Sequence, residues 1–259
     1  MHRIIATLIA TTAISGAAGA ATVIGLAGDR TIVRIDPASA AVTGMIEVSG
    51  ADRLLGIDYR PANGTLIGVT DNQTIVTIDP ETGAATEIAA MTAQLPIAEG
   101  APVIVDVNPA ADKLRFMSGT TNHRVDMDSG EATVDGALNW AEGDANAGAP
   151  FMVAGTGYTN SHGKPETTAM FNIDAALSSL LQQTAPNDGT NATIGSLGVA
   201  LEGPIGFDVA ADGEGANTAW LAALGGLHTV DLETGAVSES WQIDGLDVAL
   251  RDITVWPSM

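Results

Sequence analysis

The sequence predicts an all-β fold, a single β-propeller of about five four-stranded blades. Three observations predict it. The chain resembles itself at intervals of roughly 45 residues, its β-branched segments are short and separated by turn residues, and no helical pattern lies between them. Parallel βαβ units are disfavoured, because they would require a helix of about 10–15 residues between successive strands.

The internal repeat is clearest between residues 22–37, TVIGLAGDRTIVRIDP, and residues 65–80, TLIGVTDNQTIVTIDP. Nine of the sixteen positions are identical at an offset of 43 without a gap. The aspartate near the end of this phrase recurs along the chain at spacings of 43, 47, 48 and 57 residues. These aspartates are Asp36, Asp79, Asp126, Asp174 and Asp231, of which Asp174 is the approximate match.

The second unit shows how one blade is built. We expect its strands at residues 54–60, 65–70, 74–79 and 84–89. The hairpin IDPETG joins the last two strands: Asp79 accepts hydrogen bonds at its start, Pro80 presets φ and Gly83 adopts a positive φ. The middle strands are apolar on both faces, so both faces should be covered.

The two ends of the chain are predicted to complete one blade. The first unit, which begins at Thr22, lacks the leading strand that the other units have. The C-terminal segment Ile253–Trp256 has the character of that strand, and its pairing with the first unit would close the ring and remove an exposed edge. The fourth unit is irregular, and its NID, residues 172–174, is expected to end a second strand rather than a third. We therefore expect one domain, residues 21–259, and a monomer.

Residues 1–20, MHRIIATLIATTAISGAAGA, are typical of a secretory signal peptide. A short basic start precedes the apolar stretch Ile4–Ile14, and AGA provides a small-residue cleavage site after Ala20. The alternative is an ordinary N-terminal helix. No later stretch reaches roughly 18 apolar residues, so no membrane span is expected in the mature chain. We expect a periplasmic or extracellular protein.

Composition excludes several classes of protein. The 259 residues are 46% hydrophobic and carry 31 acidic against 10 basic residues, a net charge of −21. Such an acidic chain repels nucleic acid and anionic lipid. The surplus of acid is read as a solubilising surface, with attraction of cations as the alternative. Since there is no cysteine, thiol catalysis, thiolate metal sites and disulfides are excluded.

Several phrases resemble the bacterial domain-of-unknown-function 4394 family. They are LLGIDYRPANGTLIGVT, IVTIDPETGAAT, VDGALNWAEGDANAGAP, GYTN and APNDGTNATIGSLGV. The resemblance covers roughly residues 21–235 and implies an exported protein with repeated propeller strands, but it implies no activity. It includes the positions of Arg115 and Arg124, whereas His123 departs from the family pattern.

Three aspartates are candidates for an axial metal site. Asp58, Asp106 and Asp208 occupy equivalent places on the leading strand of their units, and that strand is innermost in a propeller. Three carboxylates around one channel suit Ca²⁺, which prefers oxygen ligands. The structural alternative is that each carboxylate accepts backbone N–H groups. Gly157 and Thr254 stand at the matching places of the other two units.

Other candidates are a loop, three arginines and a tryptophan. Asp144 and Asn146 of the GDANAG loop offer oxygens for a hard cation, or simply form a tight turn. The side chains of Arg60, Arg115 and Arg124 are candidates for binding a carboxylate or phosphate, or for pairing with acids within the fold. Trp140, beside the loop, is a candidate for ligand stacking, or for packing between blades.

No catalytic constellation is recognisable from the sequence. There is no nucleophile elbow, no zinc spacing of histidines and no dinucleotide fingerprint. We therefore expect a binding or interaction scaffold without a cofactor, whose partner is a protein, a glycan or a small ligand. The alternative is a Ca²⁺-dependent, lactonase-like hydrolase with Asp58, Asp106 and Asp208 around an axial ion.

Overall fold

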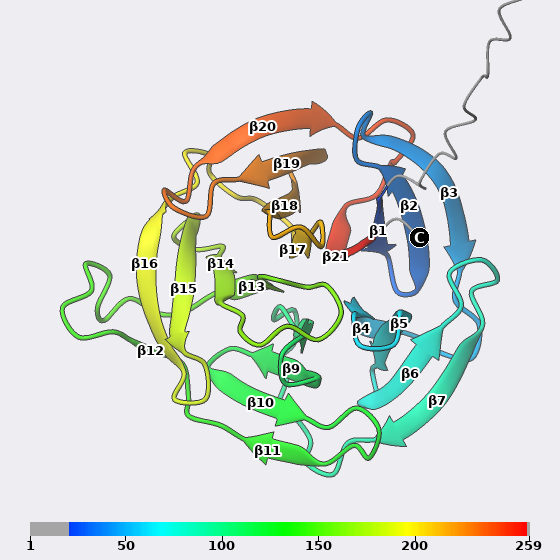
Figure 1. Ribbon diagram of the computed structural model, residues 1–259, viewed down its shortest axis with the longest axis horizontal. Coiled ribbons are helices and arrows are strands. Elements are labelled where there is room, and N and C mark those ends of the chain that lie inside the picture. Colours follow the sequence, from blue (N-terminus) through cyan, green and yellow to red (C-terminus); the bar gives the residue numbers. More distant parts are fainter. Residues whose placement is uncertain (1–20, 258–259) are drawn as a thin grey trace, which may run out of the picture.

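The computed structural model describes residues 21–257, which form five small, mostly antiparallel sheets in a ring (Figure 1). The predicted signal peptide, residues 1–20, lies outside the described residues. None of the described residues form a helix long and apolar enough to cross a membrane. The architecture is a five-bladed β-propeller, as the repeat predicts.

The blades are numbered here in chain order, and their strands are given from the axis outward. Blade 1 contains β21 (Leu250–Trp256), β1 (Thr22–Ala27), β2 (Thr31–Asp36) and β3 (Ala41–Glu47). Blade 2 contains β4 (Leu54–Arg60), β5 (Thr65–Thr70), β6 (Thr74–Ile78) and β7 (Ala85–Ala90). Blade 3 contains β8 (Ile104–Asn108), β9 (Lys113–Ser118), β10 (Thr121–Val125) and β11 (Ala132–Val134).

Blade 4 contains β13 (Val153–Tyr158), β14 (Met170–Asp174), β15 (Ser179–Ala185) and β16 (Thr190–Ser196). The short strand β12 (Asn139–Trp140) pairs in parallel with β16 at the outer edge, an addition that the repeat does not predict. Blade 5 contains β17 (Gly206–Ala211), β18 (Asn217–Ala223), β19 (Gly226–Val230) and β20 (Val237–Gln242).

The hydrophobic core is divided into five layers, one between each pair of neighbouring blades. Side chains alternate along a strand, so consecutive residues face opposite neighbours. In β5, Leu66 packs in the layer towards blade 1 and Ile67 in the layer towards blade 3. This sandwiching explains why the middle strands are apolar on both faces, as predicted.

Ring closure occurs as predicted. β21 pairs with β1 in antiparallel register, from Thr22 opposite Trp256 to Ala27 opposite Leu250. Figure 1 shows β21, in red, beside β1, in dark blue. The inner strands then follow one another around the axis, with β21 in contact with both β17 and β4.

The predicted outer turns are also confirmed. In the turn after β6, Asp79 Oδ1 accepts hydrogen bonds from the backbone N–H groups of Glu81 at 2.8 Å and Thr82 at 3.0 Å, and Gly83 has φ of 71°. Asp174 lies at the end of β14, the second strand of blade 4, so the irregular unit is arranged as expected.

Candidate functional site

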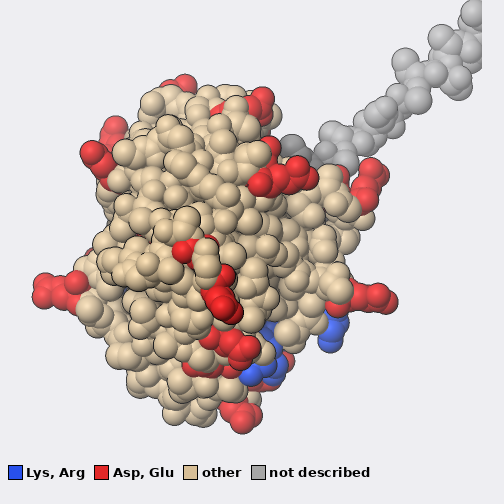
Figure 2. Space-filling model, turned by 90° about the vertical axis from the view of Figure 1, so that its left-hand side faces the viewer, with Lys and Arg blue, Asp and Glu red and all other residues tan. Residues whose placement is uncertain are grey.

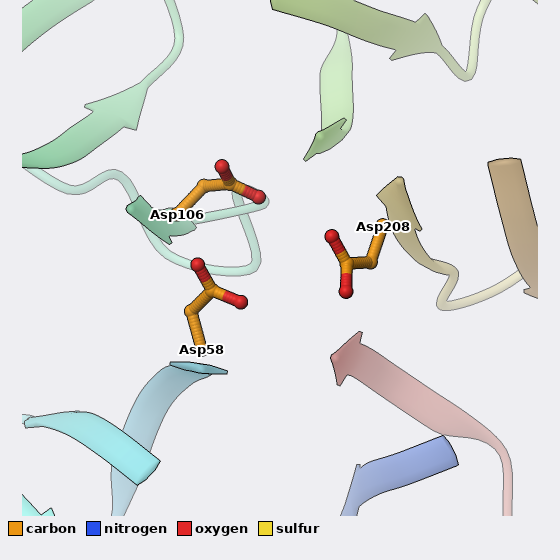
Figure 3. A group of neighbouring side chains, drawn as sticks. All are labelled: Asp58, Asp106 and Asp208. Carbon is orange, nitrogen blue, oxygen red and sulfur yellow. The ribbon is translucent and has the colours of Figure 1, made fainter. Parts of the chain in front are cut away.

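The structure brings the three predicted axial aspartates together. Asp58 on β4, Asp106 on β8 and Asp208 on β17 each offer an oxygen, and these oxygens lie within 4.8 Å of one another. All three residues are buried, with exposed fractions of 5 to 7%. Figure 3 shows their carboxylates turned towards a common space between the inner strands.

Two of these carboxylates are held by hydrogen bonds across blade boundaries. Asp58 accepts from Val107 N at 2.6 Å, on blade 3, and from its own neighbour Tyr59 N at 2.7 Å. Asp208 accepts in the same manner from Val255 N at 2.7 Å, on blade 1. Asp58 and Asp208 therefore accept hydrogen bonds from backbone N–H groups, which is the structural alternative to metal binding.

Asp106 differs from the other two. Its carboxylate accepts no hydrogen bond from the residues that the structure describes, although only 5% of the residue is exposed. Burial, followed by the negative charges of Asp58 and Asp208, raises the pKa of Asp106 well above its ordinary value. Removing a carboxylate from water without a hydrogen-bond donor costs free energy. The ionised form of Asp106 is therefore unfavourable in the folded protein unless a proton or a cation neutralises it.

The matching places on the other two inner strands have the residues expected. Thr254 on β21 donates its hydroxyl to Asp58 at 2.7 Å and in turn accepts from Tyr59 N at 3.0 Å. Gly157 on β13 leaves no room for a side chain, because a Cβ there would lie 2.7 Å from Val209 N.

A fourth axial carboxylate was missed by the sequence analysis. Asp252 on β21 accepts hydrogen bonds from Ile57 N at 2.8 Å and Ile253 N at 3.0 Å. Burial raises its pKa to about 8. Asp252 could have been identified from the sequence because it lies two residues before Thr254, and residues two apart in a strand face the same side.

Arg60 forms ion pairs within the fold. It contacts Asp112 through Nε and Nη2, both at 2.8 Å, and Asp128 through Nη1 at 2.8 Å. Both acids belong to turns of blade 3, so Arg60 connects the inner strand of blade 2 to its neighbour. This geometry matches the pairing alternative; a ligand role for Arg60 stays a prediction.

Arg115 and Arg124 do converge, as their predicted strands suggested. They stand opposite one another in the pairing of β9 with β10, and both contact the Asp135 side chain, which is 5% exposed, at 2.8 and 3.2 Å. Arg115 is 2% exposed and also donates to Asn122 at 2.8 Å. Arg124 makes this single contact, and its buried Nε has no partner among the described residues.

A cleft of about 380 Å³ opens beside these arginines, between blades 3 and 4. Its lining residues are Asn108, Ala111, Lys113, Leu114, Arg115, Arg124, Ala185, Pro186, Asn187 and Asp188. Lys113, which the sequence analysis did not single out, pairs with Asp126 at its edge. The cleft therefore gathers three of the ten basic residues of a strongly acidic chain.

The GDANAG loop is anchored to β16. Asp144 accepts from Thr193 N at 2.6 Å and from Thr193 Oγ1 at 2.9 Å, and the Asn146 amide donates to the same hydroxyl at 2.9 Å. Trp140 stacks on Phe151 with ring centroids 4.3 Å apart, and its indole N–H donates to Ala149 O. These contacts describe turn and packing roles; cation binding and ligand stacking there stay predictions.

On the face drawn in Figure 2, acidic side chains are scattered and basic ones are few. The acidic patches are separate from one another, and the basic side chains gather in the lower right part of this view. A solubilising role and the attraction of cations both stay predictions for this charge.

Five four-stranded blades, closed by the C-terminal strand around buried inner carboxylates, define the protein as a five-bladed β-propeller. The sequence profile of the family described as Domain of unknown function (DUF4394) matches residues 31–254. The chain belongs to this family. A comparison with curated proteins gives no match.

Solved structures resemble the chain in fold. A structural genomics protein of unknown function from Bacteroides thetaiotaomicron is 15% identical with a TM-score of 0.53, over 95% of this chain and 66% of that one. An auxiliary nutrient binding protein from Bacteroides ovatus is 13% identical with a TM-score of 0.47, over 84% and 58%. The calcium-binding protein regucalcin from Agrobacterium tumefaciens is 14% identical with a TM-score of 0.47, over 84% and 68%.

Proposed function

We propose that this protein is an exported, monomeric binding propeller that takes a small anionic ligand in the cleft between blades 3 and 4. The observation that carries the proposal is the meeting of Lys113, Arg115 and Arg124 in the cleft of about 380 Å³. Ligand pockets for small molecules typically have volumes of about 300–1,000 Å³. Export rests on the sequence of residues 1–20.

Arg124 is the residue best placed to bind the ligand. Arg115 is buried and its guanidinium already contacts Asp135, Asn122 and Asn187. The side chain of Arg124 is 36% exposed and makes one hydrogen bond, at 3.2 Å. Its planar guanidinium therefore retains donors for a carboxylate or phosphate, which it can contact through two parallel hydrogen bonds.

Neutralisation of the cleft by nearby acids limits the affinity. Asp135 lies between the two arginines, and Asp126 pairs with Lys113. The ligand therefore gains from directed hydrogen bonds more than from a large positive field. This argument favours a compact carboxylate or phosphate over a polyanion such as nucleic acid.

No specific observation supports the hydrolytic activity of the alternative, a Ca²⁺-dependent hydrolase. Metal-assisted hydrolysis requires an open coordination position where substrate and water meet. The cavity at the axial aspartates has a volume of about 10 Å³, enough for one small ion or water. The hydrolase stays an untested prediction, and the geometry favours the binding protein.

Isothermal titration calorimetry of the mature protein with citrate and with inorganic phosphate tests the proposal. We expect binding of at least one anion, and binding about tenfold or more weaker in Arg124→Gln, because a charged hydrogen bond contributes about 1.5–3 kcal/mol. Glucose is the neutral control ligand.

Arg34→Gln is the matched control variant. Arg34, on β2 of blade 1, pairs with Glu81 of blade 2 at 2.7 Å and does not line the cleft. The variant removes the same charge, so its anion binding should equal that of the wild-type protein. The proposal is overturned if neither anion binds, or if Arg124→Gln and Arg34→Gln lose affinity equally.

A further inference from the structure

A small chamber lies on the propeller axis among the three inner aspartates. It has a volume of about 10 Å³, and its lining includes Asp58, Asp106, Asp208, Thr254, Tyr59 and Tyr158. The three carboxylates come from inner strands of blades 2, 3 and 5, and Figure 3 shows them turned towards one another. The chamber therefore joins three of the five blades at one point.

The hydrogen bonds in the chamber leave one side chain without a partner. Asp58 and Asp208 are each fixed by two backbone N–H groups, and Thr254 Oγ1 lies 2.7 Å from Asp58 and 3.2 Å from Asp208. Asp106 is buried, points into the chamber and accepts no hydrogen bond from residues 21–257. A buried carboxylate without a donor indicates that something absent from the chain completes its environment.

The negative charge of the chamber also indicates that a group absent from the chain binds there. Among the described residues, this is the one group of three or more acidic or histidine side chains whose ligand atoms lie close enough to hold a metal ion. Asp252 adds a fourth, partly buried carboxyl nearby, and the positive charge that opposes Asp106 belongs to Arg115, whose guanidinium is engaged by Asp135. Three carboxylates in one small chamber either retain protons or neutralise a cation.

We infer that the axial chamber binds one divalent cation of the Ca²⁺ type, held by Asp58, Asp106 and Asp208. Ca²⁺ has oxygen ligands at about 2.3–2.6 Å, so two of its ligands are at most about 5 Å apart. The aspartate oxygens lie within 4.8 Å of one another, so they satisfy this limit. Mg²⁺ usually keeps several of its waters, for which a chamber of about 10 Å³ has no room.

The cation has a structural role in this arrangement. It cross-links the inner strands of blades 2, 3 and 5, and the chamber has no volume for a substrate beside the ion. Because the ion binds the native state, it stabilises the folded ring by mass action. The inference is independent of the anion cleft between blades 3 and 4.

The experiment uses mature protein freed of metal with EDTA and then dialysed. Terbium(III), a hard-cation probe that replaces Ca²⁺ in oxygen sites, is titrated while luminescence is excited through tyrosine, since Tyr59 and Tyr158 line the chamber. We expect saturable luminescence that Ca²⁺ displaces and Mg²⁺ does not. Thermal unfolding should also shift upward by about 5 °C or more at Ca²⁺ concentrations about 100 times the dissociation constant.

Asp106→Asn is the decisive variant. It removes one charge and no hydrogen bond, so the variant should fold in EDTA as the wild-type protein does, which circular dichroism checks. We expect its terbium and Ca²⁺ affinities to fall more than about tenfold, because Ca²⁺ affinity depends on the number of charged ligands. Asp144→Asn, in the GDANAG loop, is the matched control and should bind as the wild-type protein does.

Three results would overturn the inference. The first is the absence of terbium luminescence and of any Ca²⁺-dependent shift in the wild-type protein. The second is a response that Asp106→Asn retains in full. The third is a response lost in Asp144→Asn but not in Asp106→Asn, which would place the ion in the loop. The wild-type titration alone decides the first result, whatever the variants do.

Discussion

The aspartates of this protein differ in burial and in what their oxygens contact, and these two properties decide their chemistry. Asp79 and Asp231 lie at exposed turns, where backbone N–H groups lower their pKa values. Asp208 also accepts two backbone N–H groups, but burial dominates and raises its pKa to about 6. Aspartate therefore stabilises a turn at the rim of the propeller, whereas at the axis its ionised form is destabilised by burial.

Asp252 predicts a pH dependence of stability. Its pKa is about 8 in the folded protein and about 3.9 in an unfolded chain. Between these values the folded state binds the proton more tightly, so the free energy of unfolding falls as pH rises. The slope from this group is up to about 1.4 kcal/mol per pH unit. Asp252→Asn does not titrate and should have a flatter profile.

Urea unfolding in EDTA, at intervals from pH 5 to pH 8, measures this slope. Asp212→Asn is the control, since backbone hydrogen bonds lower the pKa of Asp212 and its titration lies below that range. An unchanged slope in Asp252→Asn would show that this carboxyl is not the group that titrates.

At the scale of elements, the outer hairpin of each blade contacts the preceding blade. Ser49 N, after β3, donates to Gly83 O at 2.8 Å, and Ala85 N donates back to Ser49 O at 3.0 Å. Thr92, after β7, bonds Gly130 O of the next turn in the same way, at 2.9 Å. The repeated Asp-x-x-x-Gly turn therefore connects blades as well as strands.

Gly83 is expected to be sensitive to substitution for this reason. A Cβ there would lie 2.5 Å from Glu47 O, and φ is 71°. Gly28 has φ of 55° and nothing within 4 Å of its Cβ position. Gly28→Ala should cost about 1 kcal/mol through φ alone, whereas Gly83→Ala should cost about 1–3 kcal/mol more through the clash.

Chemical denaturation of the two variants measures the difference between them. Equal losses of stability would mean that the turn moves away from blade 1 without penalty, and that the contact with Glu47 is not important for packing.

For the molecule as a whole, closure by β21 is expected to be essential. Leu250, Ile253 and Val255 are buried, each at 6% exposure or less. Burial of each contributes about 2 kcal/mol, so their joint loss approaches the whole stability of a typical domain. A chain that ends at residue 249 should therefore lack a cooperative unfolding transition.

A circular permutant separates strand position from chain order. It begins at Leu250 and connects Trp256 to Thr22 through a short turn, which the antiparallel pairing of these two residues allows. We expect the permutant to unfold cooperatively in urea, followed by tryptophan fluorescence. Cooperative unfolding of the truncated chain would contradict the role assigned to β21.

Much of the architecture could be predicted from the sequence because each propeller blade is formed mainly by strands that are consecutive in the chain. Within one blade, strand pairing connects neighbouring segments, so β-rich runs and turn residues specify it nearly completely. The closing strand was recognisable because Ile253–Trp256 supplies what the unit beginning at Thr22 lacks. The equivalence of Asp58, Asp106 and Asp208 followed from the same repetition.

The partners of individual side chains were decided by tertiary structure. Thr254 and Asp58 are 196 residues apart and share a hydrogen bond of 2.7 Å. Whether a carboxylate reaches an N–H of the next blade depends on how the blades are rotated about the axis, and no local pattern records that rotation. The unpartnered state of Asp106 and the contribution of Asp252 therefore became visible only in the folded ring.

The sequence by itself determined the number of blades, their order and the strand that closes them, since these depend on periodic hydrophobicity and turn chemistry within each unit. Only the tertiary structure decided that Arg124 borders a cleft between blades 3 and 4 and that Asp106 faces the axial chamber without a hydrogen-bond donor. Both features are made by different blades, and their geometry is set by packing across the five core layers.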